Sequence, residues 1–227
     1  MGALGFDTFT EILRQRGGNN DAFDSAGESG INYYGVFINS AYRQLCTQDN
    51  ILGLKKRLYF PQLHTSTTAT TISGTPYISV PSDALYITEV FDTTNGRKLD
   101  NIPWKEYVTF TDRTTSASYG DPTEWTRSAG YIYLHVTPGT TGDTLTIYYK
   151  KLISDLSGTQ TTLVGAEWDD VILELAAYKM FTFLHEYDKS KFCKESFLEM
   201  AVGLAGIYFS EEKDRDKSIG PSAAYMP

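Results

Sequence analysis

The chain has 227 residues, of which 41% are hydrophobic, 14% aromatic and 21% charged, and its formal net charge is −8. This composition is typical of a globular protein that is long enough to bury its own core, so disorder is expected only near the ends. The acidic balance, with no basic run longer than Lys55-Lys56-Arg57, disfavours a protein that grips nucleic acid by its phosphates. No apolar run indicates a membrane span, and the first residues lack the pattern of a signal peptide or a myristoylation site, so we expect a soluble protein made in a cytoplasm.

Two amphipathic helices are predicted in the first 50 residues. In residues 7–16 one face is apolar, and Asp7 or Thr8 is expected to be the N-cap. That face consists of Phe9, Ile12 and Leu13. The glycine- and asparagine-rich residues 17–30 favour an exposed loop. A longer apolar stripe then predicts a helix over residues 31–48, and its members are Ile31, Tyr34, Phe37, Ile38, Ala41 and Leu45.

Residues 58–150 have the pattern of β-strands and are rich in threonine, tyrosine, valine and isoleucine. The expected strand segments are LYFPQLH, TATTIS, YISV, LYITEVFD, TEWTRS, YIYLHV and DTLTIYYKK. Pro81 cannot donate to a β ladder, so it is expected at a strand end. Asn95-Gly96 suits a tight hairpin turn, because both residues accept positive φ angles.

The strand at residues 131–136 is expected to be one-sided, with Ile132, Leu134 and Val136 on a face that packs on a core. Its other face is open to water or to a neighbour. Between residues 101 and 122 the periodicity is weak, and a single helical turn is expected around Trp104.

The helical period resumes after residue 165. One helix is predicted with Glu167, Asp169 and Asp170 in its first turn, where the helix dipole favours carboxylates. Its apolar stripe consists of Trp168, Val171, Ile172, Leu175, Ala176, Met180 and Phe183. A second helix follows, whose aligned residues are Cys193, Phe197, Met200, Ala201, Leu204 and Tyr208. Together the two are expected to form a helical hairpin.

These elements predict an α+β protein, in which helices from both ends of the chain form one helical bundle and an antiparallel β-rich domain is inserted between them. The apolar stripes of the terminal helices require this, since each is too large to leave in water at about 25 cal/mol per Å². The bundle takes residues 1–57 and 151–212, and the inserted domain takes residues 58–150. Residues 213–227 have too little apolar content to fold alone, so they are expected to be an extended arm that orders on a partner, or a disordered tail.

Catalytic, cofactor-binding and metal-binding motifs are missing from the sequence. His64, His135 and His185 lack the spacing of a zinc site, so they are expected to be structural or surface residues. Cys46 and Cys193 are expected to be buried, reduced thiols. We therefore predict neither an enzyme nor a cofactor; a hidden hydrolase would need converging carboxylates, and the sequence nominates none.

The three tryptophans are either core and interface anchors or platforms that stack on sugars. Trp168 belongs to a helical stripe and is expected in the core. Trp125, which follows the Gly-Asp-Pro turn at residues 120–122, is the candidate for carbohydrate recognition, whereas Trp104 has no such context.

Acidic residues dominate the two C-terminal helices. Residues 166–212 contain ten acids against four lysines, a net charge of −6. One interpretation is a solvated face, and the other is a wall past which DNA slides, because like charge holds phosphates at a distance. The candidate DNA-channel carboxylates are Glu167, Asp170 and Glu174.

The order of these segments resembles the head-to-tail adaptor proteins of tailed bacteriophages, also called connector, head completion or tail-tubular gatekeeper proteins. The resemblance covers roughly residues 30–212. The matching segments are INSAYRQLC, YISVPSDALYITEVFD, GDPTEWTRSAGYIYLHVTPG, DTLTIYYKK and EWDDVILELAAYKMFTFL.

The resemblance implies a structural virion protein without enzymatic activity. Such adaptors form rings, commonly of twelve subunits, beneath the portal at the capsid vertex; their helices surround the DNA channel and their β-rich parts face the tail or nozzle. DNA would pass without specific binding. The C-terminal arm would dock on the portal through Ile219, Pro221, Tyr225, Met226 and Pro227. The alternative is a carbohydrate- or receptor-binding module of a phage fibre or a secreted protein.

Overall fold

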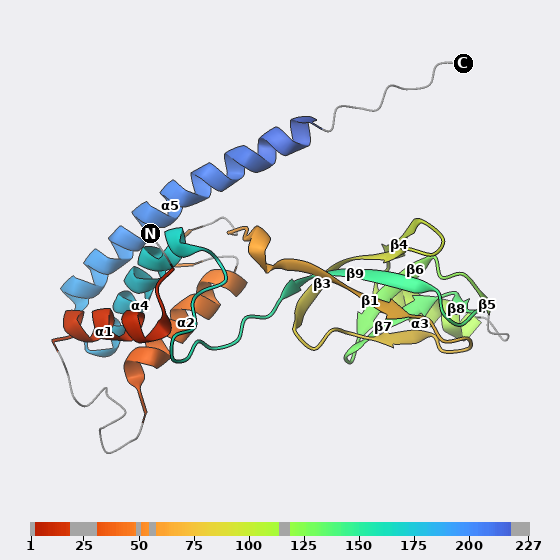
Figure 1. Ribbon diagram of the computed structural model, residues 1–227, viewed down its shortest axis with the longest axis horizontal. Coiled ribbons are helices and arrows are strands. Elements are labelled where there is room, and N and C mark those ends of the chain that lie inside the picture. The colour runs from red at the N-terminus through yellow and green to blue at the C-terminus, as the bar shows by residue number, and fades with distance from the viewer. Residues whose placement is uncertain (1–2, 19–30, 49–50, 55–57, 114–118, 219–227) are drawn as a thin grey trace. The chain divides into compact units, whose positions relative to one another are not determined.

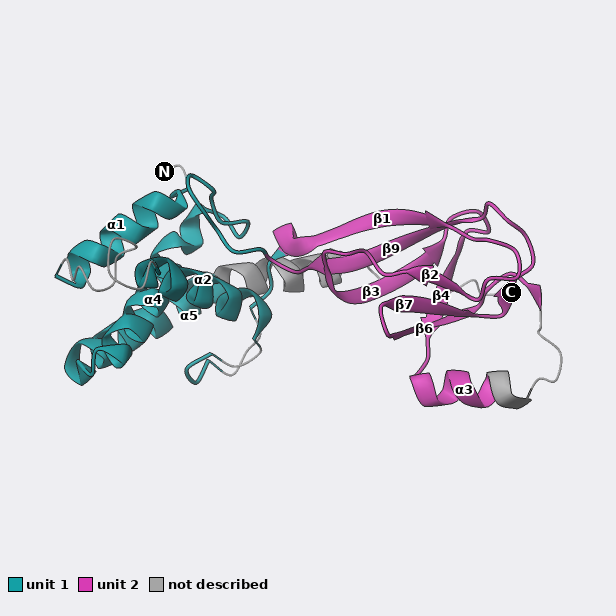
Figure 2. Ribbon diagram, turned by 90° about the horizontal axis from the view of Figure 1, so that it is seen from below, with its two compact units in different colours: residues 1–60, 154–227 teal, residues 61–153 magenta. Residues whose placement is uncertain are grey.

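A computed structural model describes residues 3–18, 31–48, 51–54, 58–113 and 119–218, with the backbone alone at 111–113 and 206–218. Helices and strands are both present, which confirms the α+β class (Figure 1). The chain divides into a helical unit, residues 1–60 and 154–227, and a β-rich unit, residues 61–153 (Figure 2). In the part of the chain that is described, no helix is long and apolar enough to cross a membrane.

The helical unit contains the four helices that the apolar stripes predict. They are α1 (Phe6–Arg16), α2 (Tyr33–Thr47), α4 (Asp169–Phe183) and α5 (Tyr187–Ser218). Helix α4 contacts each of the other three, and α1 also contacts α2. Helices from both ends of the chain therefore pack on one another.

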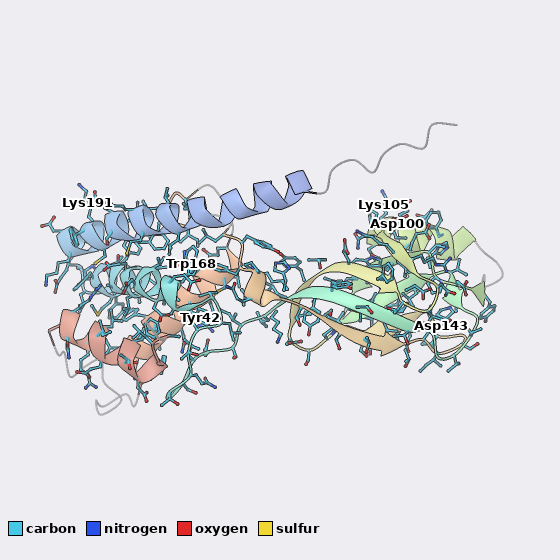
Figure 3. The ribbon with its side chains drawn as sticks, turned by 45° about the horizontal axis from the view of Figure 1, so that its top comes forward. Tyr42, Asp100, Lys105, Asp143, Trp168 and Lys191 are labelled. Carbon is cyan, nitrogen blue, oxygen red and sulfur yellow. The ribbon has the colours of Figure 1, made fainter. Side chains whose placement is uncertain are left out.

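Large aromatic side chains fill the interior of the helical unit, as Figure 3 shows for Tyr42 and Trp168. The Trp168 ring meets Phe60 edge to face, with 4.9 Å between ring centroids. The predicted stripes are wrong at two places, because Ile31 is 45% exposed and Phe183 is 56% exposed. Ile31 precedes the first helical residue, and Phe183 ends α4, so neither lies where the stripe is covered.

The start of α1 corrects the predicted side-chain cap. The helix begins at Phe6, its N-cap is Gly5, and no side chain caps it. Instead the N–H groups of Phe6 and Asp7 donate to the carbonyls of Gln160 and Gly158, at 2.8 and 2.9 Å. A distant segment thus satisfies donors that a helix start leaves unpaired, which local sequence does not reveal.

Helix α5 is longer than the sequence suggests. It extends to Ser218, so residues 213–218, which were expected to belong to the extended arm, are helical. The stretch 207–218 contains neither glycine nor proline and is rich in Glu, Lys and Arg, which have high helix propensity. The rest of the predicted arm, residues 219–227, lies outside the described residues.

The β-rich unit is built on one sheet of seven strands with the order β1-β9-β3-β4-β6-β7-β2. Their bounds are β1 (His64–Thr70), β2 (Tyr77–Ser79), β3 (Ala84–Asp92), β4 (Arg97–Asn101), β6 (Glu124–Ser128), β7 (Tyr131–His135) and β9 (Thr144–Lys151). Strands β5 (Tyr119–Gly120) and β8 (Thr137–Pro138) form a separate parallel pair. Pro61–Leu63, expected within a strand, form a short 3-10 helix instead.

The predicted antiparallel sheet is mixed, because β4 and β6 run parallel. Parallel neighbours need a long crossover, and the chain between these two strands supplies one that contains α3 (Trp104–Arg113). The single helical turn expected around Trp104 is therefore a full helix. The hairpin between β3 and β4 is confirmed: Gly96 has φ +67°, and the buried Asp92 carboxylate accepts the Asn95 N–H at 3.0 Å.

The core of the β-rich unit confirms the one-sided strand for Ile132 and Leu134, which are buried. Val136, predicted on the same face, follows the last residue of β7 and is only partly buried. Trp125 is buried beside Ile132 and Leu134 and is only 3% exposed. This confirms the expectation of a core anchor for Trp125 and excludes the alternative of carbohydrate recognition, because a sugar platform must present its ring face to solvent. Trp125 lies opposite Leu134 in the β6–β7 ladder and so takes the inner side of the sheet.

Candidate functional site

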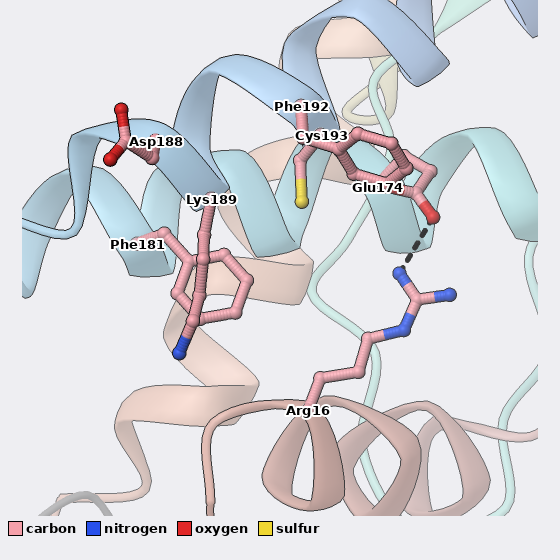
Figure 4. Close-up of a pocket in the computed structure, with 7 residues that line it drawn as sticks. All are labelled: Arg16, Glu174, Phe181, Asp188, Lys189, Phe192 and Cys193. Atoms are coloured by element: carbon pink, nitrogen blue, oxygen red, sulfur yellow. Dashed lines mark hydrogen bonds and ion pairs between the residues drawn. The ribbon is translucent and has the colours of Figure 1, made fainter.

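A hollow of about 520 Å³ opens on the helical unit (Figure 4). Helix α1 contributes Arg16, α4 contributes Glu174 and Phe181, and the first turns of α5 contribute the remaining walls, which are Asp188, Lys189, Phe192 and Cys193. The consecutive helices α4 and α5 thus meet the sequence-distant α1 at one place on the surface.

Two of the residues that line this hollow form an ion pair. Arg16 Nη1 lies 2.7 Å from Glu174 Oε1, and the Glu174 side chain is only 12% exposed. Cys193 lines the same hollow, and burial, together with the negative charge of the Glu174 carboxylate, raises the pKa of its thiol to about 11. A thiol with so high a pKa is almost entirely protonated at neutral pH, so Cys193 is not equipped to act as a nucleophile.

Three large aromatic rings are exposed where α4 ends and α5 begins. Phe192 lines the hollow, whereas Phe183 stacks on Tyr33 of α2, with 6.3 Å between ring centroids. Phe183, Tyr187 and Phe192 are 56%, 66% and 70% exposed. Lys189 Nζ lies 5.3 Å from the centroid of the Phe181 ring. Lys191, two residues further along α5 and labelled in Figure 3, is exposed. We refer to Phe183, Tyr187, Lys189, Lys191 and Phe192 as the α5-start surface. Large exposed aromatic side chains mark sites where proteins bind one another.

The three predicted channel carboxylates lie in different environments. Glu167, predicted in the first turn of the helix, lies instead in the 3-10 turn Ala166–Trp168 that precedes α4 and is exposed. Asp170 is exposed in the first turn of α4, whereas Glu174 lines the hollow and pairs with Arg16. Only the first two therefore present an exposed carboxylate to anything outside the helical unit.

Asp169 is a buried carboxylate, whereas the sequence indicates only that it lies in the first turn of a helix, where the dipole favours negative charge. It accepts the Leu4 N–H at 2.7 Å and the Thr162 hydroxyl at 3.2 Å, and burial raises its pKa. Its place in the first turn of α4 is the only sequence signal of this role. The carboxylate ties the start of the chain and the segment before α4 to one helix end.

Five aromatic rings cluster on the β-rich unit, where α3 lies over the outer side of β6 and β7. Trp104 stacks on Tyr107 and meets Tyr133 edge to face, with centroid distances of 5.3 and 5.1 Å. Tyr77 and Tyr131 continue the cluster at 4.9 Å from each other. Trp104 is 42% exposed, so it and not Trp125 is the tryptophan that solvent reaches. The sequence missed this cluster because α3 was expected to be a single turn.

The chain matches the model of the SU10 adaptor protein family over residues 11–218. It belongs to this family. The predicted class, a phage head-to-tail adaptor, is confirmed at that level, and the chain is a structural component of a bacteriophage virion. No curated protein sequence matches it.

The histidines of this phage adaptor engage local partners. His135 Nδ1 pairs with Glu124 across the β6–β7 ladder, and His185 Nδ1 lies 3.1 Å from the Tyr187 hydroxyl. Within the described ranges, no three histidine, cysteine or acidic side chains gather closely enough to hold a metal ion. The predicted thiols Cys46 and Cys193 are both buried, and neither forms a disulfide.

Proposed function

We propose that this phage adaptor forms a closed ring, of twelve subunits, that joins the portal to the tail and surrounds the DNA channel without performing chemistry. The family match over residues 11–218 carries the proposal, because it covers almost the whole chain. The exposed aromatic rings of the α5-start surface support it, since a ring requires each copy to cover part of its neighbour.

DNA passes through the ring without specific binding. The chain has a net charge of −8, and Glu167 and Asp170 are exposed at the start of α4. Carboxylates that face a channel repel phosphates and keep a duplex from adhering to the wall. Glu174 takes no part in this role, because its charge is paired with Arg16.

The helical bundle and the inserted β-rich domain have different roles in the ring. The helical bundle of residues 1–57 and 151–212 forms the wall of the ring, and the inserted residues 58–150 face the tail or nozzle proteins. The arm binds the portal, with Tyr225, Met226 and Pro227 as apolar anchors and Ile219 and Pro221 at its base. The ring assembles on the portal-bearing head in the host cytoplasm.

Native mass spectrometry and negative-stain microscopy of the full chain, alone and mixed with purified portal, test this function. We expect a closed ring of defined mass in at least one of the two samples. A chain that stays monomeric in both would contradict the proposal.

Removing residues 219–227 tests the arm separately. The truncated chain is expected to bind portal more weakly and still to form rings. Unchanged portal affinity would refute the role of the arm and leave the ring proposal standing.

A further inference from the structure

We propose that the α5-start surface of one copy docks on the start of α4 of a second copy. This inference rests on the proposed ring and identifies the contact that closes it. The receiving surface consists of Leu163, Glu167 and Asp170, which we call the α4-start surface. In this contact Glu167 and Asp170 lie between two copies and not on the channel wall, so the repulsion of DNA then rests on the net charge of the chain, −8. The argument comes from exposed apolar area, from charge and from the positions of the two surfaces on one helix.

The apolar argument concerns Phe183, Tyr187 and Phe192. Each is more than half exposed, and aromatic side chains of this size bury about 150–250 Å² each when covered. Three such rings within residues 183–192 are more than singly scattered surface residues would give. Aromatic residues at the centre of protein interfaces carry much of the binding energy. The α4-start surface offers Leu163, which is 50% exposed, as an apolar counterpart.

The charge argument concerns the stretch of chain that contains α4. Residues 152–178 contain five acids and no lysine or arginine, a charge of −5. Residues 179–194 contain four lysines and two acids, a charge of +2. The α5-start surface is therefore the basic end of an otherwise acidic body, and the α4-start surface is its acidic end. Such a pair of surfaces attracts and orients two copies of the same chain.

The positional argument is that a contact between these two surfaces requires two copies. Asp169 and Phe183, the first and last residues of α4, are 14 residues apart, or about 21 Å at about 1.5 Å per residue. The Thr162 hydroxyl bonds to Asp169, which fixes the neighbouring Leu163 at the acidic end of the helix. A single copy cannot bring its two ends together. Contacts between unlike surfaces propagate from copy to copy and close into a ring when the rotation allows.

A second copy fits the α5-start surface better than DNA does. The lysines alone would attract phosphates, but the local charge of +2 is outweighed by the net charge of −8 of the whole chain, which repels DNA. Phosphates would also leave the three aromatic rings in water, whereas a protein surface covers rings and pairs lysines at once.

Charge reversal on the full chain tests the contact. One variant carries K191E and K194E, and the other carries E167K and D170K; both leave the hollow and the core unchanged. Each variant alone places like charges at every joint, so we expect its ring fraction, alone or on portal, to fall at least about tenfold. In a mixture, a ring in which the two variants alternate again has opposite charges at every contact between copies. We therefore expect the mixture to form rings.

A matched control carries K98E and K105E, which reverse two exposed lysines of the β-rich unit, and it should assemble as the wild type does. Phe192→Ser, which removes the most exposed ring, should also weaken assembly. If both reversed variants assemble into rings as the wild type does, the contact is wrong. The contact is also wrong if the mixture of the two variants forms no rings although each variant has the melting temperature of the wild type. Intact rings with lost binding to linear duplex DNA in the K191E/K194E variant would assign the surface to DNA instead. If the wild-type chain forms no ring, the proposed function fails, which is a different result from any of these.

Discussion

Arg16 and Glu174 join α1 to α4 through an ion pair of 2.7 Å between residues that are 158 positions apart in sequence. Cys193 of α5 lines the same hollow, so residues of three helices meet around this carboxylate. The pair therefore holds the beginning of the chain against its C-terminal helices. Its partly buried carboxylate makes the link sensitive to the loss of its partner.

Arg16→Gln should destabilise the helical unit. The change leaves the Glu174 carboxylate, 12% exposed, without its cation, and an uncompensated, mostly buried charge costs about 1–3 kcal/mol. Arg43→Gln is the matched control, since Arg43 pairs with Asp155 at 3.0 Å and both side chains are about half exposed. The control should lose about 0.5 kcal/mol or less. Urea unfolding measures both, and equal losses would contradict the role of the buried carboxylate.

Cys193 should resist thiol reagents in the folded protein. With a pKa of about 11, about one thiol in a thousand is ionised at pH 8, and only the thiolate reacts. The rate at which Cys193 is alkylated in the native chain, measured by peptide mass spectrometry, should be low at pH 8 and should increase as the pH rises toward 11. The positive charge of Arg16 lowers this pKa, so Arg16→Gln should slow labelling further as long as the chain stays folded. Labelling of native Cys193 at the rate of an unfolded chain would contradict the pKa.

Tyr42 should make the helical unit sensitive to alkaline pH. Its hydroxyl accepts the Leu163 N–H at 2.9 Å, and burial raises its pKa from 10 to about 12. Between these values the unfolded chain loses the proton while the folded chain keeps it, so stability present below pH 10 is lost as pH rises toward 12. Tyr42→Phe removes this dependence and leaves the Leu163 N–H unpaired, at a cost of about 1–2 kcal/mol at pH 7. Urea midpoints at pH 8 and pH 11 measure both effects; equal pH dependence in the two proteins would exclude Tyr42 as its source.

The periodicity of the sequence predicts the helices well, because a buried stripe such as Val171, Leu175 and Met180 is a local property. The start of α1 and the parallel pairing of β4 with β6 were not predictable in this way. The first depends on carbonyls of residues 158–160, and the second on the path of the chain around α3. Both are decided by segments that meet only in the folded protein.

The candidate site was predictable only in part. The acidic start of α4 follows from composition, but the hollow needs Arg16 of α1 to meet Glu174 of α4 and Cys193 of α5. Glu174 looked equivalent to Asp170 because the two are one helical turn apart. The difference between them is the arginine that only one of them reaches.

Trp125→Ala should strongly destabilise the β-rich unit. The side chain is 3% exposed in the core of the sheet, and emptying such a site costs about 3–5 kcal/mol. Trp104→Ala, which removes a ring that is 42% exposed, is the matched control and should cost less than half as much. Thermal unfolding of the full chain separates the two. A Trp125→Ala protein of wild-type stability would contradict the buried position.

Cryo-electron microscopy of portal-bearing heads incubated with the full chain tests the ring most directly. The proposed function predicts twelve copies in a closed ring that is coaxial with the portal and encloses an open channel. Heads whose portal vertex gains no density, or gains copies away from the portal axis, would contradict it.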